Sequence, residues 1–283
     1  GNSFQKFNKL RLQLCLGLSD KGVICCSDFP VAKLLQNELR VNWQVFYNVA
    51  KSCRDIGVNY TAGKSRPSAE LIKKFDGAKS RSSKIYNLSK ISRNARKLFS
   101  GSGFPASVWG HPACGFSLSL FTQLERRAAN STGVKAEGRC RHTTLAVCYG
   151  PKGHPKARIF RETITMFIQV LQFYQKSNDF ALFVRAWEKA KAFGIHDVKH
   201  IHGHLSVMLY YLHLLGWESI AVNVWKDHLG NLWTLDSDSL SPETLICSAI
   251  DRLNRLDAVE AALHYGGNGM QDGIDYNNSF AWH

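Results

Sequence analysis

The feature that most constrains this chain is a long tract in which cationic and apolar residues alternate at helical spacing. Between positions 64 and 97 the sequence carries eleven Lys/Arg against two acids, Glu70 and Asp76, a net charge of +9. Apolar residues recur through the same tract about one helical turn apart, from Leu71 to Leu98. The pattern predicts one or two helices over 68–99 that pack one face on their own domain and turn a basic face outward.

A nucleic-acid backbone is the commonest polyanion that such a face binds, because each phosphate that is neutralised releases condensed counterions. The charge is confined to one half of the chain. Residues 1–150 carry 24 Lys/Arg and 8 Asp/Glu, a net of +16, whereas residues 151–283 carry 12 and 14, a net of −2. A basic surface that is merely solvated is the alternative. The candidate phosphate-binding residues are Lys64, Arg66, Lys73, Lys74, Arg81, Lys84, Lys90, Arg93, Arg96 and Lys97.

Other global features indicate an intracellular protein, nuclear or cytoplasmic. No apolar run approaches the roughly 20 residues that a membrane span needs, and the first thirteen residues are too polar for a secretory signal. The eight cysteines have no paired spacing, and several lie in apolar runs, where a free thiol behaves as a small hydrophobe. We therefore expect a reduced protein without a disulfide framework.

The pattern along the chain predicts an α+β fold that is mostly helical. In the first sixty residues we expect a helix over 30–39 and short strands over 10–18, 23–26, 45–51 and 55–60. After the basic tract we expect a Gly-rich break at 100–103, a helix over 117–130 and a linker at 150–155.

The second half reads as helical and rich in aromatic residues. Helices are expected over 157–175, 180–193 and 198–215, and a further helix opens at Ser241-Pro242-Glu243. Between them, 221–225 and 232–235 resemble a hairpin. The expected organisation is four segments: 1–63, 64–150, 151–265 and an irregular tail, 266–283.

No motif in the sequence nominates a catalytic centre. The chain has no phosphate-binding loop, no nucleophile elbow and no pair of adjacent acids. Four histidines fall between positions 196 and 204. His196 with His200, or His200 with His204, would suit one face of a helix, but there is no HExxH pattern and no cysteine nearby. His111 with Cys114, and Cys140 with His142, would form a zinc site only if the fold happened to bring them together. We expect no metal site in this chain.

The order of the short motifs resembles the latter part of a reverse transcriptase. The stretches 12–26, 53–60, 84–99, 105–110 and 123–129 are similar to the end of the palm, the primer-grip hairpin and the thumb of non-LTR (LINE-like) retrotransposons, especially dinoflagellate-type copies. The resemblance extends over about residues 9–240. It places Lys21 on the lysine-bearing palm strand, Ile56-Gly57-Val58 on the primer-grip hairpin and Trp109-Gly110 at the thumb signature.

The resemblance implies a fragment of an RNA-directed DNA polymerase that retains template–primer binding elements. It implies an RNA/DNA template–primer duplex as partner, no membrane, and Lys21 as a general acid near the leaving pyrophosphate. The family's Phe/Tyr-x-Asp-Asp carboxylate pair, which holds Mg²⁺ in the parent enzyme, is missing, so we expect no polymerase activity from this chain alone.

A non-enzymatic nucleic-acid-binding or protein-interaction module is the alternative, and its aromatic-rich second half would then dock a partner. An upstream extension of the reading frame that contains the acidic pair would favour the polymerase.

Overall fold

The structure is a computed structural model that describes residues 22–26, 28–50, 52–55, 58–61, 68–137, 139–235 and 242–264. The chain is α+β and mostly helical, as predicted. It divides into a smaller unit (Gly1–Ile56 and Tyr60–Lys64) and a larger unit (Gly57–Asn59 and Ser65–His283). The predicted division into four segments is not tested by this arrangement and stays a prediction.

The smaller unit is built on one helix and short strands. Helix α2 (Phe29–Trp43) begins where the Asp28 carboxylate accepts a hydrogen bond from the Val31 amide, 3.1 Å, and it ends at Gln44 with a left-handed backbone. Strands β1 (Val23–Cys25) and β2 (Asn48–Ala50) pair in parallel. Strands β3 (Ser52–Asp55) and β4 (Val58–Thr61) form a second two-stranded sheet. The expected strand over 10–18 lies outside the described residues.

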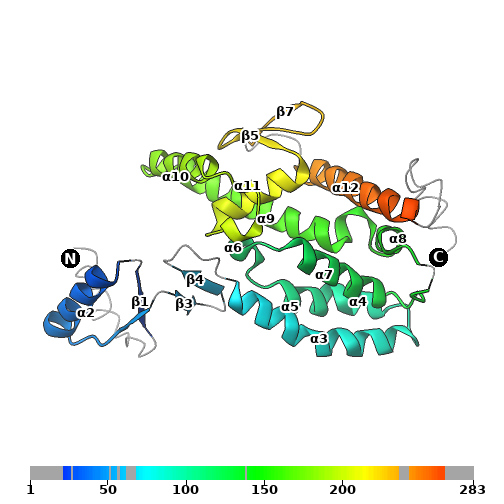
Figure 1. Cartoon of the computed structure of the whole chain (residues 1–283), viewed down its shortest axis with the longest axis horizontal. Coiled ribbons are helices and arrows are strands. Elements are labelled where there is room, and N and C mark those ends of the chain that lie inside the picture. Colours follow the sequence, from blue (N-terminus) through cyan, green and yellow to red (C-terminus); the bar gives the residue numbers. More distant parts are fainter. Residues whose placement is uncertain are drawn as a thin grey trace. The chain divides into compact units, whose positions relative to one another are not determined.

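The larger unit begins with the predicted basic helix, α3 (Ala69–Ser89), which runs along one edge of that unit in Figure 1. Its buried residues are Leu71, Phe75, Ala78, Ile85 and Ser89. They follow one another at intervals of three, four or seven residues, so they form one stripe along the helix. Helix α3 packs through this stripe against α5 and α7.

The expected Gly-rich break at 100–103 is wrong. Helix α4 (Ala95–Leu98) continues without interruption into a π-helix (Phe99–Gly103) and then into α5 (Phe104–Val108). Single π-helical turns of this kind occur inside longer helices. The guanidinium of Arg158 supports the turn by donating to the Ser100 carbonyl, 2.8 Å, and Ser107 Oγ donates to the Gly103 carbonyl, 2.7 Å.

The expected linker at 150–155 is also helical for most of its length. Helix α8 (Arg141–Gly153) is kinked at Gly150, whose φ of 69° is left-handed, and α9 (Pro155–Gln175) starts after one residue. Two helices precede them, α6 (His111–Cys114) and α7 (Leu118–Asn130), and Ser117 Oγ caps α7 by accepting from the Leu120 amide, 3.3 Å. The sequence favours a linker here because Gly and Pro occur together.

The core of the larger unit is aromatic. Helices α10 (Phe180–Ala192), α11 (His204–Leu215) and α12 (Pro242–His264) complete the helical set with a short 3-10 turn, Val198–His200. The expected helix over 198–215 therefore starts later than predicted. Phe160 stacks on Tyr211, with ring centroids 4.3 Å apart, and Phe167 packs on Trp187 at 5.0 Å. Helix α11 is buried almost all round and packs against α9 and α10.

The predicted hairpin is present as part of a three-stranded antiparallel sheet. Strands β6 (Val224–Lys226) and β7 (Leu232–Thr234) pair as expected, and β5 (Glu218–Ala221), which the sequence did not suggest, pairs with β6. The β6–β7 turn is built around Asp227, whose carboxylate accepts from the Leu229 and Asn231 amides and from Trp233 Nε1. In the described part of the chain, no helix is long and apolar enough to cross a membrane.

Candidate nucleic-acid interface

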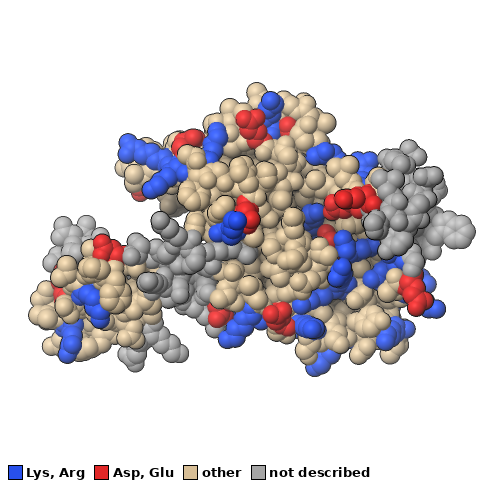
Figure 2. Space-filling model, in the orientation of Figure 1, with Lys and Arg blue, Asp and Glu red and all other residues tan. Residues whose placement is uncertain are grey.

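Four of the predicted phosphate-binding residues share one side of α3. With 3.6 residues per turn, Lys73, Lys74, Arg81 and Lys84 fall within an arc of about 100° on this helix. The arc lies away from the buried stripe. We call these four residues the α3 basic face. Figure 2 shows Lys and Arg side chains, with a few acids among them, along the edge that α3 forms in Figure 1.

Three of the four side chains in the α3 basic face are exposed. Lys73, Arg81 and Lys84 are exposed, and Lys74 is half-buried, with Nζ 5.6 Å from the centre of the Trp109 ring. Within the described residues, Lys73 and Lys84 have no carboxylate partner. Arg81 donates weakly to the Ser102 carbonyl, 3.4 Å. A polyanion can therefore approach cations that are already held in place by a packed helix.

Four more predicted residues continue past the end of α3. Lys90, Arg93 and Lys97 are exposed and Arg96 is half-buried. The Lys90 ammonium lies 4.6 Å from the centre of the Tyr86 ring, a cation–π contact. These residues follow the helix into α4, so the cationic surface extends beyond α3.

Of the remaining predicted site residues, Val58 lies in the described part of the chain. Lys21, Ile56, Gly57, Lys64 and Arg66 lie outside the described residues. Val58 begins β4, which pairs with β3, so a two-stranded element stands where the sequence predicted the primer-grip hairpin. The thumb-signature pair lies at the end of α5, where Trp109 is exposed and Gly110 has a left-handed φ of 85°.

One cation near α3 is structural. Arg127 on α7 donates to the Phe75 carbonyl, 2.6 Å, and its guanidinium lies 3.8 Å from the centre of the Phe75 ring. Partial burial lowers the pKa of Arg127 from its ordinary value, while Asp76 acts in the opposite direction. The contact joins α3 to α7. It gives a structural role to Arg127, which the sequence shows only as one of two adjacent arginines.

The histidines between positions 196 and 204 do not converge. His196 Nδ1 lies 3.4 Å from His213 Nδ1 on the surface, while His204 Nδ1 donates to the Pro112 carbonyl, 2.8 Å. His200 and His202 both approach the Phe193 ring edge to face. Each histidine therefore serves a different local contact.

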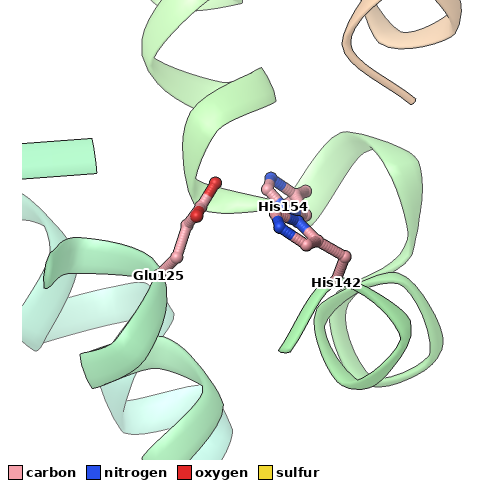
Figure 3. A group of neighbouring side chains, drawn as sticks. All are labelled: Glu125, His142 and His154. Carbon is pink, nitrogen blue, oxygen red and sulfur yellow. The ribbon is translucent and has the colours of Figure 1, made fainter. Parts of the chain in front are cut away.

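A second polar group, which the sequence did not single out, is buried between α7, α8 and α9. Glu125 is 3% exposed, His142 6% and His154 3%, and one nitrogen or oxygen from each lies within 4.8 Å of the others. Figure 3 shows the Glu125 carboxylate facing the two imidazole rings. We call these three residues the Glu125–His142–His154 cluster. They come from three separate elements, so only the fold brings them together.

Burial controls the ionisation of this cluster. It lowers the pKa of His142 to about 4 and that of His154 well below the ordinary value, and it raises the pKa of Glu125. Arg141 and Lys156 oppose the rise at Glu125, and Arg141 Nε lies 3.2 Å from Glu125 Oε2. Both imidazoles are therefore neutral at pH 7.

His154 also has a structural role, because it is the cap of α9. Its Nδ1 accepts from the Lys156 amide at 3.3 Å, and its Nε2 lies 3.2 Å from the Asn254 side-chain nitrogen on α12. Both contacts are long for hydrogen bonds between nitrogen atoms.

Comparison with known proteins adds no relative: no protein-family model, no curated protein and no solved structure matches this chain.

Proposed function

We propose that this chain binds the sugar–phosphate backbone of a nucleic-acid duplex through the α3 basic face and the cations that follow it. The observation that carries the proposal is the pair Lys73 and Lys84 on α3. Both lysines are exposed and have no carboxylate partner among the described residues, while another side of the helix is buried. The template–primer duplex of a non-LTR reverse transcriptase is the partner that the order of sequence motifs favours.

The spacing of the cations suits a phosphate backbone. Helix α3 has 21 residues, so with a rise of 1.5 Å per residue it is roughly 32 Å long. Lys73 and Lys84 are eleven positions apart, which corresponds to roughly 16 Å along the helix. A duplex strand presents a phosphate about every 3.4 Å of its axis. One helix can therefore contact several successive phosphates, and such contacts do not select a base sequence.

A direct test is the salt dependence of binding. The full chain is titrated with an RNA–DNA hybrid at two or more salt concentrations, and log K is plotted against log salt. We expect a steep linear decrease, whose slope counts the phosphates neutralised at about 0.9 per contact on a B-form duplex. A flat plot, or no binding at low salt, contradicts the proposal.

Substitutions locate the surface. Lys73→Gln with Lys84→Gln should reduce affinity and lower the slope by about one for each lysine. Lys189→Gln with Lys191→Gln on α10 is the matched control, because it removes the same charge from an exposed helix in the neutral half. Equal losses in the two variants would indicate binding to overall charge and not to α3.

The alternative, a protein-interaction module docking through its aromatic residues, has less support. Phe167, Trp187 and Tyr211 belong to the packed core of the larger unit. Of the aromatic side chains in this half, Phe173 is 69% exposed and Phe193 63%, and they lie on different helices. Most of these aromatic side chains are therefore buried in the core.

A further inference from the structure

The Glu125–His142–His154 cluster has the donor set of a transition-metal site. We propose that it binds one divalent ion of the zinc class. Imidazole and carboxylate are ordinary ligands of zinc, and two histidines with one glutamate is an established donor combination. The sequence suggested no metal site because Glu125, His142 and His154 are far apart in sequence and follow no ligand motif.

Two donor atoms of the cluster are unused. Glu125 Oε1 and His142 Nδ1 are fully buried and have no hydrogen-bond partner within the described residues. A buried polar atom without a partner is costly, and most such atoms in folded proteins have a partner or an ordered water. An ion between the two atoms would satisfy both.

The third ligand can be released from its present contacts. His154 makes two long contacts, to the Lys156 amide and to Asn254, and coordination by either nitrogen replaces one of them. If Nδ1 binds the ion, Nε2–H can donate to Asn254 Oδ1, which has no partner now. An outer-shell partner of this kind orients a histidine ligand.

The three donor atoms lie near the spacing that a metal ion requires. A tetrahedral ion holds nitrogen ligands at about 2.0–2.1 Å, which places them roughly 3.3 Å apart. The three donor atoms already lie within 4.8 Å of one another, so small side-chain rotations close the site. A cavity of about 20 Å³ is lined by His142, His154 and Asn254 and extends to Gly150 and Arg255. Glu125 is not part of this lining, and the volume accommodates about one water molecule beside the two histidines.

Nearby cationic side chains limit the affinity of the cluster for a metal ion. Arg141 pairs with Glu125 Oε2, and its Nη2 lies 3.1 Å from His142 Nε2, so the proton of that ring is on Nδ1 when no ion is bound. Coordination by Nδ1 therefore requires that this proton leave Nδ1 and that Arg141 turn away from the ring. The Lys156 ammonium is 3.6 Å from the Asp257 carboxylate, which compensates its charge.

The test uses the full chain and the metal alone. After treatment with a chelator, the chain is loaded with Zn²⁺, passed through a desalting column and analysed for metal content. Co²⁺ is then titrated, because its visible absorption reports the coordination geometry. We expect one ion per chain, intense absorption typical of four- or five-coordinate cobalt, and a higher unfolding temperature with Zn²⁺.

Variants assign the ligands. His142→Gln and Glu125→Gln should each weaken Zn²⁺ binding by about 100-fold or more, because outer-shell changes alone cost about 10- to 100-fold. Arg141→Gln should tighten binding, because it removes the cation that competes for Glu125. A residue with a merely structural role would not produce that gain. His213→Ala is the control, since His213 and His196 form an exposed pair that could hold metal adventitiously.

If a variant fails to fold, the proposal can still be tested in the unaltered chain. The assigned imidazole resonances of His142 and His154 are then followed by NMR. We expect both to shift with one equivalent of Zn²⁺. Unchanged resonances, no retained metal, or metal lost in His213→Ala but kept in Glu125→Gln would overturn the proposal. Duplex binding does not enter this test.

Discussion

At the residue scale, one glycine in α3 lies within the α3 basic face. Gly77 has helical neighbours on both sides, and a Cβ built on it meets no atom within 4 Å. Glycine in a helix interior costs stability relative to alanine, because its backbone loses more freedom on folding. A small residue also lets a phosphate backbone approach the helix closely.

Gly77→Ala should raise the free energy of unfolding by about 0.5–1 kcal/mol. Chemical denaturation measures this change. Gly133→Ala is the matched control and should lower the free energy of unfolding. Gly133 has a φ of 79°, and a Cβ there would lie 2.5 Å from the Ser89 carbonyl oxygen. Destabilisation by Gly77→Ala would show that the position is not in a regular open helix.

His111 makes stability depend on pH. Complete burial lowers its pKa from 6.5 to about 4, and only part of this is offset by Glu162, whose Oε2 is 3.7 Å from His111 Nε2. The unfolded chain therefore binds more protons than the folded chain between these two values, so stability falls as the pH decreases from about 6.5 to 4. The loss from this residue should reach roughly 3 kcal/mol at the acid end.

Unfolding measured at pH 7 and at pH 4.5 tests this effect. We expect the loss between the two conditions to be smaller in His111→Gln than in the unaltered chain. His213→Gln is the control, because it replaces an exposed histidine. Identical pH profiles for all three proteins would contradict the assignment to His111.

At the scale of elements, the π-helix depends on an arginine from another helix. Arg158 on α9 donates to the Ser100 carbonyl and to Glu162, and its guanidinium lies 4.1 Å from the centre of the Phe104 ring. A π-turn leaves carbonyl groups without the usual helical donor, so a fixed external donor stabilises it. The planar guanidinium makes these three contacts at once, which lysine cannot do.

Arg158→Lys should therefore lower the free energy of unfolding by about 1–2 kcal/mol although it keeps the charge. Arg185→Lys on α10 is exposed and serves as the control, with an expected change below about 0.5 kcal/mol. Equal effects of the two substitutions would remove the proposed role of Arg158.

The sequence predicts best those elements that are stabilised by residues close to one another in the sequence. Helices α7 and α9 have regular apolar spacing and lie nearly at the predicted bounds, whereas α3 occupies the first two thirds of the range in which one or two helices are predicted. The π-helix was missed because Gly101 and Gly103 indicate a break, while its stabilising donor lies 58 residues away in Arg158. Strand β5 was missed because it is set by pairing with β6.

The candidate sites differ in the same way. The α3 basic face could be predicted because its residues lie on one helix, whose period is visible in the sequence. The Glu125–His142–His154 cluster could not, because it depends on how three elements pack. The only sequence signal was the neighbouring pair Cys140 and His142, and Cys140 is exposed and not part of the cluster.

At the scale of the whole molecule, we expect no nucleotide polymerisation from this chain. Two-metal phosphoryl transfer needs carboxylates that converge on both ions. In the described part of the basic half, Asp28 caps α2, and Glu125 is grouped with two histidines and no second carboxylate, so neither belongs to a set of converging acids. Primer extension with Mg²⁺, a template–primer and all four nucleotides should not exceed that of a boiled control, while duplex binding persists. Extension that is lost when Asp20, Asp28 and Asp55 are changed to Asn would contradict this expectation.

The almost complete burial of α11 bears on the order in which the larger unit opens. Because packed elements surround this helix, its amide hydrogens can exchange with solvent only when the whole unit unfolds. Deuterium uptake by α11 should therefore be the slowest in the chain and should report the global free energy of unfolding. The first turn of α3, which has an exposed side and no side-chain cap, should exchange sooner. The end of the α3 basic face at Lys73 and Lys74 thus borders the part of the unit that opens at a lower energetic cost.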